Sequence, residues 1–372
     1  MNQNKLQVMY RGILVGTLAA MPDKRIAFQY SRQWLQEGFA LNPLSLPLKD
    51  KVYIPGYEPF GGLFGVFADS LPDGWGRLLV DRFLMKNNFV SGKIGNLERL
   101  AIVADSGMGA LEYFPASSFV LPDSKLDLDT LAAECKAILS DKDCANLDDM
   151  FALGGSSGGA RPKILTNIDG DEWIIKFPAR EDGQDIGLQE YEYALCAREC
   201  GIDMAEVRLF PSAKCAGYFG TKRFDRRQGR KIHMCSVSGL LETSHRIPNL
   251  DYDLLMKLTR ILCRDTGEQE KLFRMMCFNV YAHNRDDHSK NFSYLYDEND
   301  KSWHLSPAYD MTYSNSLGGE HATTVHGNGT GPGREDILAV ARTAGLNADR
   351  AGKIADDIRE CVSDMLCKYI VR

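Results

Sequence analysis

Ten consecutive residues, Asn284 to Ser293, contain two aspartates, a histidine, a lysine and two asparagines. An apolar, helix-like run precedes them, and two short apolar segments around a polar turn follow, which predicts helix, loop and β-hairpin. Asp286 and Asn291 are five positions apart. A loop of this length can turn the acid toward an incoming hydroxyl while the amide oxygen holds a metal ion. The stretch therefore indicates phosphoryl transfer; a solvated polar loop is the plainer alternative.

A second carboxylate, Asp310, follows the predicted hairpin directly after Tyr309. Mg²⁺ prefers a few hard oxygen ligands together with substrate phosphates. Protein kinases use a loop Asp as the base, and a loop Asn with a following Asp as metal ligands. We therefore predict Asp286 as the base, Asn291 and Asp310 as metal ligands, and Lys290 as a positive charge beside the transferred group.

A glycine- and serine-rich segment at 154–163 precedes a predicted strand. It is not a Walker loop, which needs Gly-Lys and then Ser or Thr, because Ala160 follows Gly159. Successive main-chain N–H groups of such a loop can surround an anion. Two cations within the segment favour a phosphate-facing loop over a flexible hairpin tip. The candidate contacts are Gly158, Gly159, Ala160, Arg161, Pro162 and Lys163.

Lys176 ends an apolar strand, and Glu190 lies fourteen positions later at the start of a predicted helix. In kinases such a pair holds the nucleotide phosphates, with the Glu orienting the Lys. Glu192 is a competing partner on another side of the helix. A lysine at a strand end is usually only solvated, but the position of Lys176 between the two candidate loops favours a nucleotide role.

Lys222, Arg223 and Phe224 follow a further predicted strand and precede a more helical half of the chain. A connector at this point would join two lobes, and adenine commonly binds to the main chain of such a bridge. A basic patch or an interdomain salt-bridge cluster explains the same residues equally well. The order of the pieces along the chain nevertheless matches that of a two-lobed kinase.

The composition is that of an ordinary folded protein of two or three domains, with 372 residues of which 44% are hydrophobic and 25% charged. The net charge of −6 gives no general attraction to nucleic acid, so DNA contact would need a local basic patch or a partner protein. The ten cysteines form no Cys-x-x-Cys pair, although Cys196 and Cys200 share a helix face. We expect reduced thiols packed as small apolar groups in a reducing cytoplasm.

No run reaches the roughly 18 apolar residues of a membrane span. The apolar run at 12–21 is expected to form strands, and not a signal peptide. Further strands are predicted at 6–10, 25–30, 163–165 and 172–177, and as a pair near 206–223. Helices are predicted at 32–35, 126–139 and 188–200, in a segment that ends at about 86, and in most of the chain beyond about 250. A connector with Pro and Asp surrounds the single helix expected in 118–150.

On these motifs the chain resembles the HipA family of serine/threonine kinases, the toxin halves of bacterial toxin–antitoxin pairs. The likeness runs nearly from end to end. Segments 10–18, 47–48 and 69–74 resemble the N-terminal β subdomain of that family, and 159–163 resembles its loop motif. Segments 286–293 and 309–310 resemble its catalytic and metal motifs.

The resemblance implies an α+β, two-lobed, protein-kinase-like fold with an extra N-terminal, mostly β subdomain. We predict this subdomain at 1–115, a lobe with the glycine-rich loop at 116–225, and a mainly α-helical lobe with the catalytic loop and metal site at 226–372. It also implies ATP and Mg²⁺ as cofactors, Asp286 as the general base, and His288 as support for the loop and nucleotide. The other implied nucleotide contacts are Lys176, Glu190, Lys222, Arg223, Phe224, Tyr309 and Asp310.

Ser156 matches the autophosphorylated serine of the family, with Ser157 as the alternative acceptor. A dianion there would repel the ATP phosphates and expel the loop. Two positions depart from the family pattern. Lys222 stands where an acid often precedes the Arg-Phe-Asp-Arg run, and Asp287 stands where a small residue is common.

The resulting hypothesis is a cytoplasmic protein kinase toxin with a HipB-like, helix-turn-helix antitoxin as partner and no membrane association. Operator DNA would be reached mainly through the antitoxin. The resemblance suggests an aminoacyl-tRNA synthetase as substrate, with growth arrest as the outcome. A small-molecule kinase and an inactive, antitoxin-binding co-repressor subunit are the alternatives. The intact set of Asp286, Asn291, Asp310 and Lys176 argues against the inactive subunit.

Overall fold

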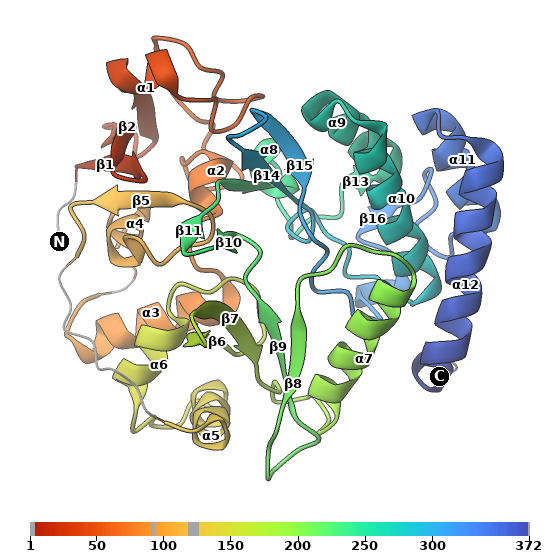
Figure 1. Ribbon diagram of the computed structural model, residues 1–372. Coiled ribbons are helices and arrows are strands. Elements are labelled where there is room, and N and C mark those ends of the chain that lie inside the picture. Colours follow the sequence, from red (N-terminus) through yellow and green to blue (C-terminus); the bar gives the residue numbers. More distant parts are fainter. Residues whose placement is uncertain (1–3, 91, 93, 118–125, 371–372) are drawn as a thin grey trace. The chain divides into compact units, whose positions relative to one another are not determined.

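The computed structural model describes residues 4–90, 92, 94–117 and 126–370, so part of the predicted connector, 118–125, lies outside the described residues (Figure 1). The chain divides into two compact units. Unit 1 comprises Met1–Gly187 and Leu209–Thr243, and unit 2 comprises Leu188–Arg208 and Ser244–Arg372. The boundaries of these two units differ from those of the three predicted domains. The bounds of the domains remain a prediction.

Unit 1 begins with an antiparallel sheet in the order β4-β3-β2-β1-β5. Leu6, Val8 and Tyr10 of the first strand are buried at every second position, which is the pattern of a sheet with one covered face. The three strands predicted at the N-terminus are confirmed. The strands are β1 (Lys5–Tyr10), β2 (Ile13–Ala20), β3 (Ile26–Tyr30), β4 (Val52–Tyr53) and β5 (Leu111–Phe114).

Short helices lie between these strands. The Ser31 hydroxyl accepts the Trp34 N–H at 3.0 Å and caps the first of them, as expected for an N-cap serine. The predicted helix that ends at Lys86 is confirmed and begins at Gly74. The helices are α1 (Arg32–Glu37), α2 (Gly65–Ala68), α3 (Gly74–Lys86) and α4 (Asn96–Val103).

A second sheet, which belongs to unit 1 apart from the first two residues of β8, has the order β6-β7-β9-β8 and carries the glycine-rich loop at one end. The predicted hairpin is formed by β6 (Lys163–Ile168) and β7 (Asp171–Lys176), and the later strand pair is β8 (Val207–Phe210) and β9 (Tyr218–Lys222). Two helices, α5 (Leu128–Leu139) and α6 (Leu147–Gly154), cover it together with α3. The prediction of one helix in 118–150 was wrong, since α6 also begins there.

The core under these helices combines both parts of unit 1. Trp75 and Leu79 of α3 pack with Met150 of α6 and with Ile164 and Ile175 of the second sheet. All five are at most 2% exposed. The N-terminal β subdomain therefore shares its hydrophobic core with the sheet that carries the glycine-rich loop.

A buried ionic cluster also joins the two sheets of unit 1. Asp225 is fully buried and lies 2.8 Å from both Arg223 and Arg226. It accepts the Gly109 N–H at 2.7 Å, and Arg223 donates to the Gly107 carbonyl at 3.0 Å, just before β5. Burial alone would raise the pKa of Asp225, but the two guanidinium groups outweigh burial and leave that pKa below its ordinary value.

The remaining elements of unit 1 follow this cluster. They are β10 (Arg226–Arg227), β11 (Arg230–Lys231), β12 (Met234–Ser236) and α8 (Val237–Leu240). Asp69 accepts the Ser236 N–H at 2.7 Å, and Glu242 accepts the Gly65 N–H at 2.9 Å. These bonds fasten the segment up to Thr243 to the N-terminal subdomain.

Unit 2 is mainly helical, as predicted. Its long helix α10 packs against α9, α11 and α12, and Leu272, Phe273, Met276 and Phe278 of α10 are completely buried. The unit contains most of α7 (Ile186–Glu199), then β13 (Leu250–Asp251), α9 (Tyr252–Cys263), α10 (Thr266–Tyr281), β14 (Ser293–Asp297), β15 (Ser302–Leu305), β16 (Thr323–Thr324), α11 (Arg334–Ala344) and α12 (Ala348–Ile370).

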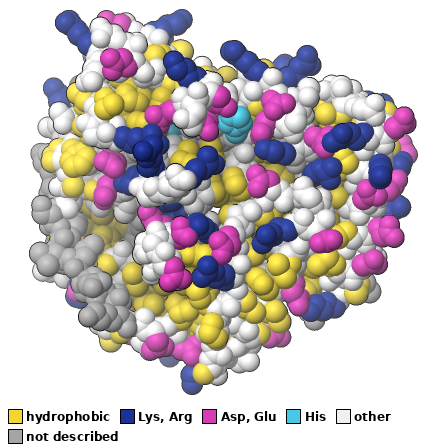
Figure 2. All heavy atoms as spheres, viewed as in Figure 1, with side chains coloured by type: hydrophobic (Ala, Val, Ile, Leu, Met, Phe, Trp, Pro, Cys, Tyr) yellow, Lys and Arg dark blue, Asp and Glu magenta, His cyan; other side chains and the backbone are white. Residues whose placement is uncertain are grey.

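The surface carries both signs of charge. Figure 2 shows Lys and Arg interspersed with Asp and Glu on the face in view, in keeping with the small net charge of −6. In the part of the chain that the structure describes, no helix combines the length and the apolar character that crossing a bilayer requires.

We predict that Asp225→Asn destabilises unit 1 by about 3–5 kcal/mol, because the two buried guanidinium groups lose the buried carboxylate that they share and keep only the more exposed Glu172. The measurement is the urea midpoint of the unfolding transition. Asp23→Asn is the matched control, because its ion pair with Arg25 lies at the surface. The control should leave the midpoint unchanged, and equal midpoints for the two variants would contradict a stabilising role for the cluster.

Candidate active site

The predicted catalytic loop lies in unit 2, between the C-terminus of α10 and β14. Asn284 bridges to Ser314 before the loop turns away, and the hairpin of β14 and β15 follows with Tyr294 opposite Leu305. The order of helix, loop and hairpin agrees with the sequence prediction. The loop is therefore held between two regular elements at its ends.

Asp287 anchors the middle of this loop. Its side chain is completely buried and accepts hydrogen bonds from the Tyr252 hydroxyl at 2.9 Å, from His321 Nδ1 at 3.0 Å and from the Thr323 N–H at 3.1 Å. The Thr323 hydroxyl donates to the Asp287 carbonyl. Four bonds to one residue fix the loop, while the neighbouring Asp286 side chain stays 63% exposed.

The same network extends to Asp310. Asn279 donates from Nδ2 to the Tyr252 hydroxyl at 2.9 Å and accepts from Asn284 Nδ2 at 2.9 Å. Asn284 Nδ2 also lies 3.5 Å from the Asp310 carbonyl. Burial and the Asp287 carboxylate raise the pKa of Tyr252 well above its ordinary value, so its hydroxyl remains a donor. The loop with Asp286 and Asp287 and the segment with Asp310 are thus connected by one buried hydrogen-bond network.

Hydrogen bonds inside the loop orient its candidate chemical groups. Asn291 donates from Nδ2 to the Asp286 carbonyl at 2.7 Å, and its own N–H donates to the His288 carbonyl at 2.9 Å. The Lys290 N–H donates to His288 Nδ1 at 3.2 Å. In neutral His288 the proton therefore lies on Nε2, which is 3.9 Å from the Asp286 carboxylate.

Tyr309 joins the catalytic loop to the segment with Asp310. Its hydroxyl donates to the Lys290 carbonyl at 2.6 Å and lies 2.6 Å from Ser293 Oγ. Asp310 has a φ of +53°, a left-handed conformation that is uncommon for a residue other than glycine. Asp286, Asn291 and Asp310 are therefore all held by bonds within unit 2. Tyr309 was predicted as a nucleotide contact, and that role remains a prediction.

The glycine-rich loop of unit 1 is packed on the N-terminus of α3. The Gly159 N–H donates to the Asp73 carboxylate, and the Gly159 carbonyl accepts the Trp75 N–H at 2.9 Å. A Cβ on Gly74 would lie 2.4 Å from the Gly159 carbonyl oxygen, and one on Gly76 would lie 2.2 Å from the Ser157 carbonyl oxygen. Only glycine at these two positions allows the loop to lie so close.

Two lysines lie next to this loop. Lys163 and Lys176 are directly opposite each other on β6 and β7, so their side chains share one face of the sheet. They are 8% and 9% exposed, and Lys176 Nζ lies 5.4 Å from the centre of the Phe219 ring. Lys163 Nζ is 2.6 Å from the place of a Cβ on Gly159. The arrangement concentrates positive charge beside main-chain N–H groups.

Other residues of the loop have structural contacts. Arg161 pairs with Asp182 at 3.2 Å, and the Pro162 carbonyl accepts the Phe177 N–H at 2.8 Å. Ser157 is buried, and its hydroxyl donates to the Gly154 carbonyl at 2.6 Å. Ser156 is only half-buried. Of the two candidate acceptors of phosphate, Ser156 is therefore the more accessible.

The predicted connector, Lys222 to Phe224, lies inside unit 1 and not at a crossing between the units. Lys222 pairs with Asp171 at 2.6 Å. Arg223 belongs to the buried cluster around Asp225 and also pairs with Glu172 at 3.2 Å. The interpretation as a salt-bridge cluster, one of the alternatives open from the sequence, accounts for both cationic side chains.

The two glutamates of α7 have different surroundings. Glu192 pairs with Lys368 of α12 at 2.7 Å and accepts a hydrogen bond from the Tyr369 hydroxyl. Both contacts lie within unit 2, and the choice between Glu190 and Glu192 as partner of Lys176 remains a prediction. Glu190 is 4% exposed. Glu190 and Lys176 belong to different units, so their pairing remains a prediction.

Sequence reasoning missed several residues that hold the candidate site. Asp287 was noted only as a departure from the family pattern, and His321, Thr323 and Asp73 were not singled out. Asn279 carried one usable signal, a polar side chain within the apolar helix that precedes the loop. Buried polar groups need partners, so such a residue indicates an internal hydrogen-bond network.

The chain has a kinase-like α+β fold with an added N-terminal β subdomain, as predicted. The chain belongs to the HipA family. The family model described as HipA-like C-terminal domain matches residues 155–366, more than half of the chain, and the one described as HipA N-terminal domain matches residues 6–114. The resemblance seen in the sequence is confirmed.

Relatives and solved structures agree with this membership. The chain is 25% identical over 327 residues to "Putative kinase Y4dM" of Sinorhizobium fredii, covering 82% of this chain and 76% of that protein. It is 25% identical over 343 residues to "Putative kinase Y4mE" of the same organism, with the same coverage. HipA from the Shewanella oneidensis complex of HipA, HipB and operator DNA superposes with a TM-score of 0.72 at 17% identity, over 98% of this chain and 91% of that one.

We predict that Asp287→Ala destabilises unit 2 and opens the loop, because three buried donors lose their acceptor at about 1–3 kcal/mol each. The measurements are the urea midpoint and amide hydrogen exchange across 284–293. Asp286→Ala is the matched control, since it removes the neighbouring but exposed carboxylate. Equal exchange in the two variants would contradict the anchoring role of Asp287.

Proposed function

We propose that the protein is an ATP- and Mg²⁺-dependent serine/threonine protein kinase of the HipA toxin type. The observation that carries the proposal is the shared network that holds Asp286, Asn291 and Asp310 in unit 2 of a HipA-family chain. An aspartate base and two following oxygen ligands are the set that protein kinases use. Two curated relatives have names that contain the word kinase, which supports the same class.

In this proposal the oxygen of the substrate hydroxyl bonds to the γ-phosphorus of ATP, and Asp286 accepts the proton that this hydroxyl loses. The bond between that phosphorus and the β–γ bridging oxygen breaks, and ADP leaves. Asp286 is exposed enough for a serine or threonine of a protein to reach it. His288 supports the loop, with its Nε2 3.9 Å from the Asp286 carboxylate. Lys290 offsets charge on the transferred group.

The donor set fits Mg²⁺, because Asn291 and Asp310 offer an amide oxygen and carboxylate oxygens. Asn291 uses its amide nitrogen in the bond to the Asp286 carbonyl, so Oδ1 is the atom available to a cation. When bound, the ion would neutralise charge on the ATP phosphates. The hydrogen bonds of Asn284 and Tyr309 would keep the two ligand segments together.

The nucleotide phosphates are assigned to the glycine-rich loop, Lys163 and Lys176, with Glu190 orienting Lys176. The Asp73 carboxylate and the close approach of α3 give the loop a defined shape. Adenine is assigned to the main chain of Lys222 to Phe224, because the guanidinium of Arg223 is held inside the buried cluster.

The proposed partner is a HipB-like antitoxin with a helix-turn-helix domain, through which the chain would reach operator DNA. The structure of Shewanella oneidensis HipA was determined with HipB and operator DNA, which supports a partner of this kind. The proposed substrate is a protein such as an aminoacyl-tRNA synthetase, whose phosphorylation would arrest growth.

We predict that Asp286→Asn lowers phosphate transfer from ATP by about 10²–10⁴-fold, the contribution of a general base. The measurement is transfer of labelled γ-phosphate to the protein itself and to purified aminoacyl-tRNA synthetases. Asp300→Asn is the control, since Asp300 lies in the exposed turn of the hairpin and should leave transfer unchanged. Undiminished transfer in Asp286→Asn would refute the assignment of the base.

The same assay separates the two alternative functions. A small-molecule kinase would consume ATP with metabolite extracts and leave proteins unlabelled. An inactive co-repressor subunit would bind the antitoxin and show no transfer in either form. Antitoxin binding measured on the same samples also verifies that Asp286→Asn is folded.

We predict that protein made in ATP-replete cells carries phosphate on Ser156, because Ser157 is buried and bonded to Gly154. Mass-spectrometric mapping should find the modification abolished in Ser156→Ala and retained in Ser157→Ala. Phosphate retained in Ser156→Ala would assign the modification to Ser157 or to another site.

A further inference from the structure

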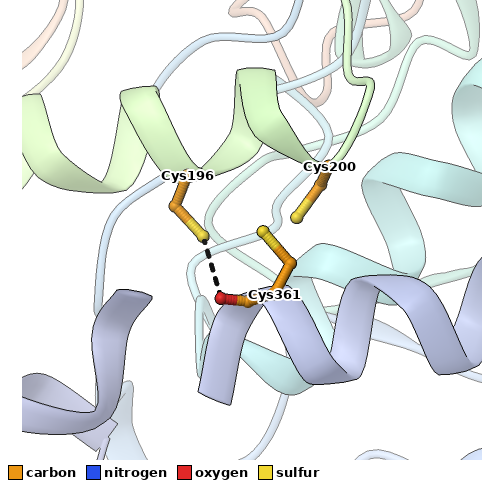
Figure 3. A group of neighbouring side chains, drawn as sticks. All are labelled: Cys196, Cys200 and Cys361. Carbon is orange, nitrogen blue, oxygen red and sulfur yellow. Dashed lines mark hydrogen bonds between the residues drawn. The ribbon is translucent and has the colours of Figure 1, made fainter. Parts of the chain in front are cut away.

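Three cysteine thiols meet between two helices of unit 2 (Figure 3). Cys196 lies on α7, Cys200 directly follows the last residue of that helix, and Cys361 is on the facing side of α12. Their sulfur atoms all lie within 4.8 Å of one another. The sequence predicted the shared face of Cys196 and Cys200, but it contained no sign that Cys361, 161 positions after Cys200, completes the group.

The three cysteines differ in their exposure to solvent. Cys196 is fully buried, Cys200 is 6% exposed, and Cys361 is half-buried. The Cys196 sulfur also lies 3.9 Å from the Cys361 carbonyl oxygen, which brings the two helices together at this point. A small ion could therefore reach the sulfurs past Cys361, while the rest of the site excludes water.

A disulfide between Cys196 and Cys200 does not fit the helical spacing, which the bond from the Cys200 N–H to the Cys196 carbonyl continues at the end of α7. Cβ atoms at i and i+4 of a helix are about 5–6 Å apart. A disulfide needs a Cβ separation of about 3.5–4.5 Å. Three sulfur atoms within 4.8 Å of one another are an arrangement that can surround one ion. With metal–sulfur bonds of about 2.3 Å, three thiolates around an ion are separated by about 4 Å, so small side-chain shifts suffice.

We propose that Cys196, Cys200 and Cys361 form a binding site for one soft metal ion, Cu(I). Soft thiolate and thioether ligands select Cu(I) and Zn²⁺ among biological metals. Met365 lies one turn after Cys361, with its sulfur 3.8 Å from the Cys361 sulfur. Among the described residues, no His or carboxylate joins the three thiols to complete the usual four-ligand zinc set. An all-sulfur set with a nearby thioether favours the monovalent ion.

A cation lies next to the main chain of the cluster, and its charge is paired with Glu270. Arg274 of α10 donates from Nη1 to the Cys200 carbonyl at 3.4 Å. The site is separate from the proposed kinase chemistry, because none of its ligands belongs to the loops assigned to ATP. Metal binding can therefore be tested whether or not the kinase proposal holds.

The experiment titrates the full chain, reduced and freed of metal, with Cu(I) in competition with a Cu(I)-selective chromophoric chelator. We expect the protein to bind one equivalent of Cu(I) in competition with the chelator. X-ray absorption spectra should show a shell of about three sulfur ligands around the ion. Cys361→Ser and Cys196→Ser should each weaken binding at least tenfold. Cu(I) should also raise the melting temperature of the unaltered chain, because an ion bound only by the native state stabilises it.

Cys367→Ser is the matched control, since Cys367 is an exposed thiol on the same helix and lies outside the cluster. It should bind Cu(I) as the unaltered chain does. Circular dichroism verifies that each variant is folded. The proposed metal site would be refuted if Cu(I) bound equally well to Cys361→Ser, Cys196→Ser and the control. A parallel titration in which Zn²⁺ displaces Cu(I) would overturn the choice of ion.

Discussion

A buried carboxylate, that of Asp287, is the constraint on which the candidate catalytic loop depends. A charge with no access to water is stable only when it is fully hydrogen-bonded, and here three donors meet it. Those donors come from α9 and from the segment around β16, elements far apart in sequence. The loop is thus part of the packing of unit 2, which lets the adjacent Asp286 remain exposed in a defined position.

In unit 1, too, contacts with a distant part of the chain fix a loop, here the glycine-rich loop. The glycine-rich segment contains little that could order it by itself, and its shape comes from Asp73 and from the two glycines of α3 that allow close contact. The N-terminal β subdomain therefore contributes directly to the candidate phosphate loop. The buried cluster around Asp225 ties the same subdomain to β9 through the Gly107 and Gly109 main chain. We infer that removing this subdomain would disorder the loop as well.

Features with a local cause could be predicted from the sequence, and features with a distant cause could not. The strands, the long helices and the five-residue spacing of Asp286 and Asn291 follow from periodicity and from short loops. The role of Asp287 could not be predicted, because its partners His321 and Thr323 lie 34 and 36 positions away. Arg223 shows the same limit, since its basic character was visible but its buried partners were not. The helix α6 was missed because Asp148 and Asp149 in its first turn are also typical of a linker.

Helix α7 connects the thiol cluster to the proposed nucleotide chemistry. It is fastened to α12 at two points, through the cysteines and through the Glu192 contacts with Lys368 and Tyr369. Glu190 lies between the crossing into unit 2 and these contacts, six positions before Cys196. A helix fixed at two points is held in one orientation, so Glu190 has a defined place within unit 2. An ion held by Cys196, Cys200 and Cys361 would fasten α7 to α12 more firmly, and with it the part of unit 2 in which Glu190 lies.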